Sequence, residues 1–221
     1  MNLTLFTYDR PHWKTQQFLY ELVGLGLKPY AIVAAPWRDL GLPLGYRMSV
    51  KHYPHHPSVL AKRFGIEYIV IPHDQMVNGH LGIIGGARIL PPKVIKGFTL
   101  GILNMHPGLI PENRGLPNVV AAMLNQMPQA VTAHVIDERI DAGRVLMSRE
   151  IEEEPDDNIW DILEKMMDLQ VRMLGPAIQA MLEGRGWDVP DDCGGYRPPM
   201  KRDDEQRAIT LWQQRRATTT I

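Results

Sequence analysis

The sequence predicts an α/β fold of the Rossmann-like class, with a mainly parallel twisted sheet flanked by helices and an irregular C-terminal tail. Short apolar runs, partly β-branched, alternate with segments of helical period, and this alternation is typical of βαβ units. The chain has 221 residues, 44% apolar and 22% charged, which suits one globular domain with a sizeable core and an appendage. We expect a main domain over residues 1–186 and an extension over residues 187–221.

The elements of this fold can be assigned in order along the chain. The expected strands are Leu3–Thr7, Tyr30–Ala34, Tyr68–Ile71, Leu81–Ile84, Thr99–Met105, Ala130–Ile136 and Val145–Ile151. The expected helices are Lys14–Leu25, Ser58–Phe64, Pro91–Ile95, Asn118–Asn125 and Ile159–Leu182. Sheets of this class bind ligands in the crevice at the carboxyl ends of their central strands.

The last of these helices has the clearest pattern. Its apolar stripe consists of Ile159, Leu163, Met166, Leu169 and Met173. Asp156 and Asp157 lie at the end where the helix dipole favours acidic side chains. Gly175-Pro176 should kink or interrupt this helix.

Two segments are rich in turn-forming residues. From Asp188 onward the chain is polar, with Gly, Pro and both signs of charge, which predicts an irregular tail that covers the main domain or mediates association. Residues 35–57 contain several Pro and Gly and predict a long loop, and long ordered loops are often functional. Neither the role of this loop nor the choice between monomer and homodimer follows from the sequence.

Composition excludes several classes of protein. The net charge of −1 and the pI near 6.7 give no general attraction for nucleic acid. Cys193 is the only cysteine, so the chain can form neither an internal disulfide nor a Cys-rich metal site. The amino terminus lacks a signal-peptide pattern, and no apolar stretch has the length of a membrane span. We therefore expect a soluble, cytoplasmic protein.

A group of histidines raises the question of a metal site. The group comprises His52, His55, His56, His73 and His80. Their spacing matches no closed set of metal ligands, so we expect no metal.

An amide, an imidazole and a carboxylate form the most informative pattern. Asn104 and His106 lie two residues apart at the end of an apolar run, and Asp141 follows 37 residues after Asn104. In an extended segment, residues i and i+2 point the same way, so the amide and the imidazole can face one pocket. A carboxylate beside them would complete a group of side chains suited to proton transfer.

These residues belong to a longer motif. The run TLGILNMHPGLIPENRG, followed by VTAHVIDERIDAG, resembles the formyltransferases that use 10-formyltetrahydrofolate. Their pattern is N-x-H-P-[SG]-L-L-P-x-x-R-G and then [ST]-x-H-x-x-x-x-x-x-D-x-G. The resemblance covers roughly residues 80–185 and implies a formyltransferase catalytic domain over residues 1–186. It makes Asn104, His106 and Asp141 the catalytic triad, with no covalent enzyme intermediate.

Other positions match the family less specifically. Thr132 and His134 are in register with the [ST]-x-H pair, either supporting the site or simply satisfying buried polar groups. The segment Gly85 to Leu90 is similar to the family's cofactor loop, and Asp137 to Asp141 to the loop on the other edge of the pteridine. The resemblance therefore implies a folate contacted by Arg88, Ile89, Leu90, Asp137, Glu138 and Ile140. Ala87 is smaller than the residue often found there, and Arg139 also departs from the pattern.

The first strand is followed by a segment that bears on the acceptor. Family members acting on glycinamide ribonucleotide carry a glycine-rich phosphate loop there, whereas residues 7–16 of this chain contain no glycine. We expect Asp9, Arg10, His12 and Lys14 to contact the acceptor instead. Arg114 is a further candidate for binding a carboxylate or phosphate, or else it pins a loop by binding carbonyl groups.

The acceptor itself is inferred by comparison within the family. Members acting on initiator transfer RNA continue into a further C-terminal domain, for which this chain ends too soon. The stretch Tyr196 to Glu205 with Trp212 is similar to a stretch of sugar N-formyltransferases. We therefore expect formyl transfer to the primary amine of an amino sugar, nucleotide-activated or related to surface glycans, in carbohydrate biosynthesis. The alternatives are glycinamide ribonucleotide as acceptor, a formyltetrahydrofolate hydrolase, and a non-catalytic folate-binding protein.

Overall fold

The computed structural model describes residues 1–37, 53–87, 89–115, 118–193, 196–198 and 200–219. Its strands are β1 (Leu3–Tyr8), β2 (Ala31–Ala35), β3 (Glu67–Val70), β4 (Gly79–Ile84), β5 (Phe98–His106), β6 (Ala130–Val135) and β7 (Val145–Glu150). Its helices are α1 (Trp13–Gly24), α3 (Pro57–Phe64), α4 (Pro92–Ile95), α5 (Asn118–Asn125), α6 (Ile159–Leu182) and α7 (Arg202–Thr219). Every expected strand and helix is present, with ends close to those predicted.

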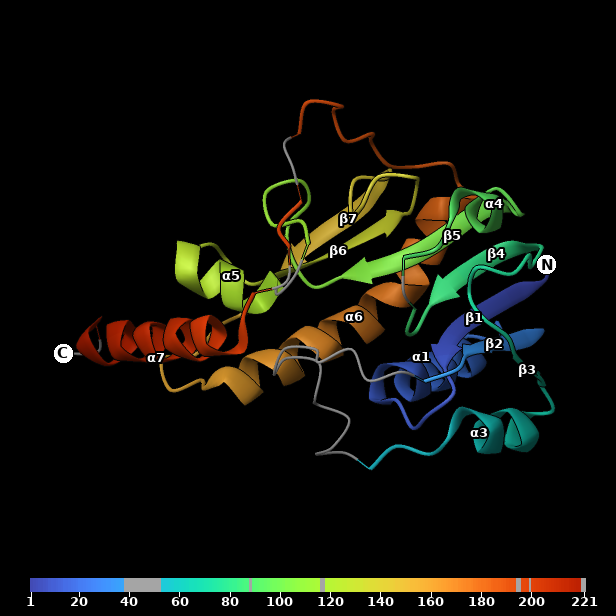
Figure 1. Ribbon diagram of the computed structural model, residues 1–221, viewed down its shortest axis with the longest axis horizontal. Coiled ribbons are helices and arrows are strands. Elements are labelled where there is room, and N and C mark those ends of the chain that lie inside the picture. The colour runs from blue at the N-terminus through green and yellow to red at the C-terminus, as the bar shows by residue number, and fades with distance from the viewer. Residues whose placement is uncertain (38–52, 88, 116–117, 194–195, 199, 220–221) are drawn as a thin grey trace.

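One seven-stranded sheet organises the domain, in the order β3-β2-β1-β4-β5-β6-β7 (Figure 1). The pairs from β3 through β5 are parallel, whereas β6 is antiparallel to both β5 and β7. From β1 the chain moves outward to β2 and β3 and then returns to β4 on the other side. This reversal between β1 and β4 is the topological switch point at which open α/β sheets bind ligands. The Rossmann-like prediction is confirmed.

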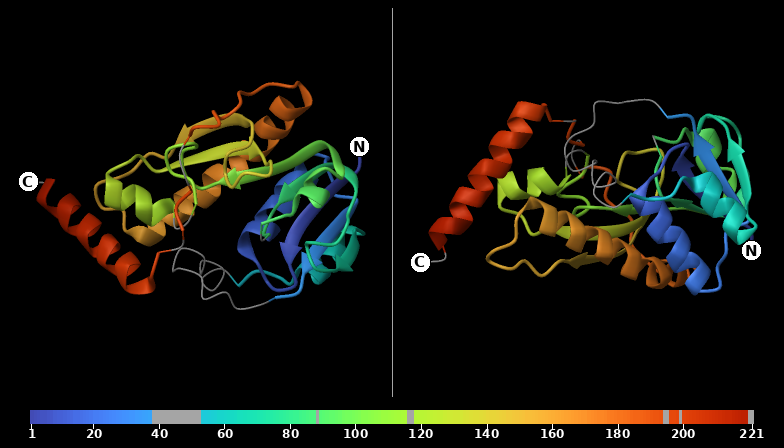
Figure 2. Two further views of the ribbon diagram at one scale, coloured as in Figure 1. Left: turned by 45° about the horizontal axis from the view of Figure 1, so that its top comes forward. Right: turned by 90° about the horizontal axis from the view of Figure 1, so that it is seen from below.

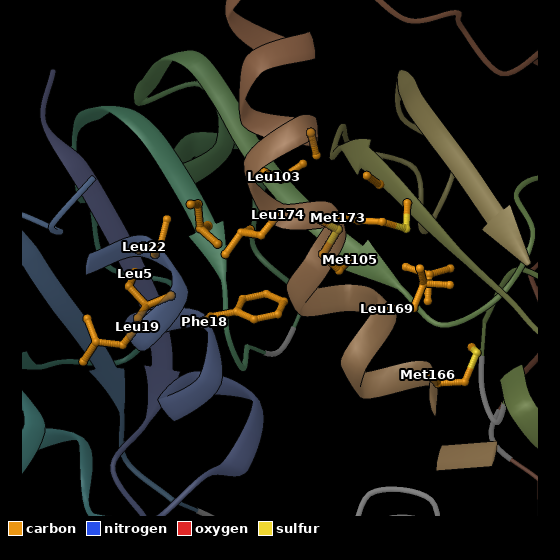
Figure 3. Close-up of a cluster of buried hydrophobic side chains, with 14 of the residues drawn as sticks. Leu5, Phe18, Leu19, Leu22, Leu103, Met105, Met166, Leu169, Met173 and Leu174 are labelled. Atoms are coloured by element: carbon orange, nitrogen blue, oxygen red, sulfur yellow. The ribbon is translucent and has the colours of Figure 1, made fainter. Parts of the chain in front are cut away.

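The larger core lies between the sheet and helices α1, α3 and α6, which cover one face (Figures 1 and 2). Figure 3 shows Phe18, Leu19 and Leu22 of α1 meeting side chains of α6 and of the strands. Leu103 and Met105 of β5 point into this core. Because side chains alternate along a strand, Asn104 and His106 point to the opposite face.

Helix α6 begins with a capping box, in which Asn158 accepts from the backbone and Asp161 accepts from the Asn158 N–H. It is continuous through Gly175-Pro176, so these residues do not interrupt it, which was one of the two expected outcomes. Leu174 and Ala177, on either side of the proline, are buried in the main core, and this packing compensates for the lost backbone hydrogen bond. Gly175 leaves room for the side chain of Leu25 at the end of α1.

The C-terminal extension corrects a second expectation, because residues 202–219 form the helix α7 rather than an irregular tail. Acidic residues in its first turn and Arg216 in its last complement the helix dipole. Glu205, Ala208, Ile209 and Trp212 have helical spacing and are all buried. The helix packs against α5 (Figures 1 and 2).

Two further observations concern the remaining segments. Residues 38–52, most of the loop expected over residues 35–57, lie outside the described residues. In the part of the chain that the structure describes, no helix is long and apolar enough to cross a membrane.

Candidate active site

Strands β5 and β6 set the positions of the polar side chains at the site. Their antiparallel register pairs Asn104 with His134 and His106 with Thr132. The four side chains therefore lie on the same face of the sheet, opposite Met105 and Ala133, which are buried in the main core. His106 is the last residue of β5, so the group lies at the carboxyl end of a central strand.

His106 is enclosed by protein, with its side chain 3% exposed. Its Nε2 lies 2.9 Å from the Asn113 carbonyl oxygen, and its Nδ1 lies 3.4 Å from Asp141 Oδ2. A ring carrying protons on both nitrogens therefore has an oxygen acceptor on each side. The side-chain amide of Asn118, at the start of α5, also lies against the ring, 2.8 Å from Nε2.

Asp141 is placed beside His106 by an unusual backbone conformation, with φ of +48°, in the left-handed region that L residues seldom adopt. The Gly115 backbone N–H donates to its Oδ2 at 3.2 Å. Burial raises the pKa of this carboxyl group, but the charge and hydrogen bond of His106, His134 and the Gly115 N–H outweigh burial and lower it to about 2. Asp141 is therefore ionised at neutral pH.

His134 orients Asn104. Burial and the neighbouring charge of His106 lower the pKa of His134 to about 4, so its ring is neutral at neutral pH. The Asn104 Nδ2 lies 3.1 Å from the His134 Nε2, which suits donation from the amide to a bare ring nitrogen. The second Asn104 N–H is then available to a ligand.

Thr132 has a different environment. Its hydroxyl donates to the Gly108 carbonyl at 2.7 Å and lies 2.9 Å from the Ser148 hydroxyl. It is fully buried. These contacts fit the alternative in which Thr132 satisfies buried polar groups and fixes the turn after β5.

The site opens into a cavity of about 770 Å³. Asn104, His106 and Asp141 line it together with loops that follow β1, β4 and β6. Of the cofactor-binding residues expected from the sequence, those lining the cavity are Ile89, Leu90, Asp137, Glu138 and Ile140. Arg88 lies outside the described residues.

Arg139 stabilises the loop on the β6 side. Its guanidinium donates to both the Asp137 carboxylate, at 2.8 Å, and the Ala142 carbonyl, at 2.7 Å. It also forms an ion pair with Asp191 of the extension. The departure from the family pattern at this position is therefore accompanied by a local network that ties the loop to the C-terminal extension.

The residues expected to contact an acceptor separate into two groups. Arg10, His12 and Lys14 line the cavity. Asp9 does not, because its Oδ1 accepts a hydrogen bond from the Tyr68 hydroxyl at 2.6 Å and pairs with His56. Its carboxylate therefore points toward β3 and away from the expected acceptor.

Arg114 is also directed away from the cavity. Its guanidinium donates to the Ile140 carbonyl at 2.7 and 3.0 Å and to the Cys193 sulfur. These contacts agree with the alternative in which Arg114 pins a loop by binding carbonyl groups. They place Arg114 between the loop that carries Asp141 and the C-terminal extension.

Several residues at the site were not anticipated from the sequence. Asn113 and Asn118 contact His106, while Tyr196, Arg197, Glu205 and Ile209 of the extension line the cavity. Arg197 donates from Nη1 to Asn113 Oδ1 at 2.8 Å, and its N–H donates to the Arg114 carbonyl. Asn113 lies inside the recognised motif and Arg197 lies in the stretch Tyr196 to Glu205, but the sequence gives no sign that these two residues, 84 positions apart, are partners.

The histidines weighed as metal ligands are dispersed. His56 caps α3, His73 contacts the Val33 carbonyl and His80 contacts the Asn2 N–H, whereas His52 lies outside the described residues. Across the described ranges, no group of three or more His, Cys, Asp or Glu side chains is arranged to hold a metal ion.

Comparison with known folds supports the architecture. An N-formyltransferase from Helicobacter canadensis superposes with a TM-score of 0.66 at 15% identity, covering 90% of this chain and 71% of that one. The phosphoribosylglycinamide formyltransferase of Streptococcus pneumoniae gives a TM-score of 0.61 at 15% identity, covering 82% of this chain and 98% of that one. At this level of identity the likeness concerns the fold.

Sequence comparison adds the family. A methionyl-tRNA formyltransferase of Heliobacterium modesticaldum is 27% identical over 186 residues, covering 83% of this chain and 54% of the relative. The chain thus spans about half the length of that relative, and less of several others. The sequence profile described as formyl transferase matches residues 82–178, which include the whole Asn104, His106 and Asp141 constellation. Residues 82–178 of this chain therefore carry a formyl transferase domain.

Proposed function

We propose that this protein transfers a formyl group from 10-formyltetrahydrofolate to the primary amine of an amino sugar, nucleotide-activated or related to surface glycans. The observation that carries the proposal is that Asn104, His106 and ionised Asp141 line one cavity together. Formyl transfer requires donors for a developing oxyanion and a route for a proton, and these three side chains supply both.

The geometry suggests a role for each group. The acceptor nitrogen attacks the formyl carbon, forming a C–N bond and a tetrahedral oxyanion. The free N–H of Asn104 donates to this oxyanion, and a donor of this kind contributes on the order of 3 kcal/mol in acyl transfer. The His106 ring, paired with Asp141 at 3.4 Å, lies beside Asn104 on the same strand and stabilises the same negative charge. Breaking the bond to N10, with a proton delivered to it, then releases tetrahydrofolate and the formamide.

A folate site is supported on both sides of the cavity. Ile89 and Leu90 line one wall, and Asp137, Glu138 and Ile140 line another. Structures with a similar fold include one holding folinic acid and one holding 5-N-formyl-tetrahydrofolate. Glu138 also pairs with Lys96 at the surface, which anchors the loop that would close on the pteridine.

The sugar acceptor is supported by the segment after β1. Arg10 stacks over Trp37, 4.0 Å from the ring centroid, and both line the cavity. Aromatic and guanidinium surfaces suit the rings and phosphates of a sugar nucleotide. Similar folds include a complex with dTDP-3-aminofucose and a complex with a UDP-linked formamido sugar.

Glycinamide ribonucleotide is the second candidate, because the phosphoribosylglycinamide formyltransferase of Streptococcus pneumoniae is matched over 98% of its length. The segment from Tyr8 to Lys14 contains no glycine, and this argues against glycinamide ribonucleotide as the acceptor. A backbone nest for phosphate relies on glycine-rich geometry, so phosphate binding here would need side-chain charges.

A panel of acceptors assayed with 10-formyltetrahydrofolate separates these proposals. The panel contains nucleotide-linked amino sugars, glycinamide ribonucleotide and methionyl-tRNA, with a no-acceptor arm that measures formate release. We expect formylation of an amino sugar. Efficient formylation of glycinamide ribonucleotide alone would replace the sugar proposal, and formate release without an acceptor would indicate a hydrolase. Folate binding without turnover in any arm would indicate a binding protein.

A further inference from the structure

Lys14 has a position in the site that the transfer step described above does not use. It lies in the first turn of α1, and its Nζ donates to the Met105 carbonyl oxygen at 3.0 Å. Met105 separates Asn104 from His106 in β5, so the Lys14 amine lies at the strand end that carries both residues. Lys14 lines the same cavity as the triad.

The surroundings of Lys14 disfavour a permanent positive charge. The amine lies at the helix end where the dipole is positive, and this opposes the weaker stabilisation that the Phe18 ring, 5.1 Å away at its centroid, gives to a cation. Within the described residues its amine forms no ion pair with a carboxylate, and Asp141 is the anion that acts on it from a distance. Burial lowers the pKa of Lys14 to about 7, with Asp141 opposing the shift.

The acceptor amine must lose a proton before it can attack, and the triad does not provide a base for this step. A primary amine in water is mainly an ammonium ion, which has no lone pair for attack. Asp141, with its pKa lowered to about 2, holds a proton poorly at neutral pH. The Nε2 of His134 is engaged by Asn104, and burial lowers the pKa of His12 to about 3, assisted by the charges of Lys14 and Arg10.

We propose that Lys14 is the base that removes this proton from the acceptor's ammonium group, a role that rests on the proposed function. An N–H bond of the acceptor breaks and an N–H bond forms at Nζ, so the neutral acceptor amine gains its lone pair and Lys14 gains the charge. The Met105 carbonyl and the field of Asp141 stabilise the resulting ammonium. The attacking nitrogen loses a second proton as the formamide forms. One of the two protons passes to the leaving nitrogen of the folate and the other is released to water, which leaves Lys14 neutral for the next turnover.

Other titratable groups face this position, and they must be separated from Lys14 in any pH experiment. Arg10 and His12 precede α1, His106 lies on β5, His134 on β6 and Asp141 on the following loop. Asp137, on the loop of Asp141, also acts on His134. The variants below leave all of these groups in place.

Two substitutions of Lys14 distinguish a role as a base from a role as a positive charge. Lys14→Gln removes the base and keeps a polar side chain, whereas Lys14→Arg keeps a cation that cannot give up its proton. We expect both to lower kcat/KM by about 100-fold, as is typical of a lost general base, while the affinity for a non-reactive folate analogue stays within about twofold. The exposed Lys28→Gln serves as the control and should retain full activity. An active Lys14→Arg enzyme would overturn the role.

The acceptor provides a second readout. With amine acceptors of lower pKa, less of the acceptor is an ammonium ion, so the defect of Lys14→Gln should shrink as the acceptor pKa falls. A defect that is constant across such a series would show that Lys14 acts through structure or binding, and would overturn the proposal.

A measurement independent of activity separates this inference from the proposed function. NMR of the Lys14 Nζ group, assigned with Lys14→Gln, reports its protonation directly. We expect neutralisation near pH 7 in the folded protein. An ammonium that persists to pH 9 would overturn the base role even if the enzyme formylates sugars. If the wild-type protein formylates no amine, the proposed function fails and this role fails with it.

Discussion

The strand pair β5–β6 and the C-terminal extension hold the same site by different means. The pair fixes Asn104, His106 and His134 through a regular backbone register. The extension contributes isolated contacts instead, among them the bridge between Gly115 and Arg197 and the ion pair of Arg139 with Asp191. The register of a strand pair determines which face of the sheet a side chain occupies, whereas isolated contacts determine how closely a loop approaches the site. The strand pair therefore positions the proposed reacting groups, and the extension contacts the loops beside them.

Residues 113–115 lie between the strand pair and the C-terminal extension and contact both. The Asn113 carbonyl contacts His106 and the Gly115 N–H contacts Asp141. On the other side, Arg197 binds the Asn113 side chain and the Arg114 carbonyl. A disturbance in the extension should thus reach the triad through this segment.

The largest expected effect falls on the strand-pair side. His106→Ala and Asp141→Asn should each lower kcat by roughly 1000-fold, because they remove charge stabilisation that is used in the transition state. Affinity for a non-reactive folate analogue, measured by calorimetry, should change little. Near-normal turnover in a folded variant would remove that residue from the triad.

Asn104→Ala should come next, with a loss of about 100-fold in kcat for one missing oxyanion donor. The companion variant His134→Gln tests how Asn104 is oriented, since glutamine can still accept a hydrogen bond from the amide. We expect a smaller loss there, measured in the same steady-state assay. An equal loss in the two variants would mean that glutamine cannot replace His134 in orienting Asn104.

Arg197→Ala examines the extension and should lower kcat by about tenfold, because it removes one hydrogen bond that holds Asn113, whose backbone carbonyl contacts His106. The thermal midpoint should fall only slightly, since the arginine lies at the surface side of the segment. Arg185→Ala is the matched control, as Arg185 pairs with Glu183 far from the site. Equal activity of the two variants would show that the extension does not position the triad.

The last expected effect concerns the pH dependence of stability, and no change in turnover is predicted from it. The folded pKa of His134, about 4, lies below its ordinary value of 6.5, so the unfolded chain binds a proton that the folded protein does not bind. Stability should fall as the pH decreases from about 6.5 to about 4, by up to roughly 3 kcal/mol. Denaturant unfolding of the wild type and of His134→Gln across this range measures it. An unchanged slope in the variant would assign the pH dependence to other groups.

The sequence by itself determined the order of the strands and helices, and it supplied the residues that we propose as reacting groups. Apolar runs such as residues 99–105 predict β5 because a buried strand must be apolar on both faces. The motif around Asn104 and His106 is local, so alternation along one strand places both side chains together. Helix α7 also left a local signal in the spacing of Glu205, Ala208, Ile209 and Trp212, which the surrounding polar composition obscured.

Only the tertiary structure decided which candidate side chains reach the cavity. Asp9 and Arg114 have suitable chemistry, yet one binds Tyr68 and the other the Ile140 carbonyl. Lys14 reaches Met105, which is 91 residues away, and Arg197 reaches Asn113. Such contacts depend on how distant segments pack, and local propensity carries no information about packing across that separation. Residue types can therefore be read from the chain, whereas their partners follow from the fold.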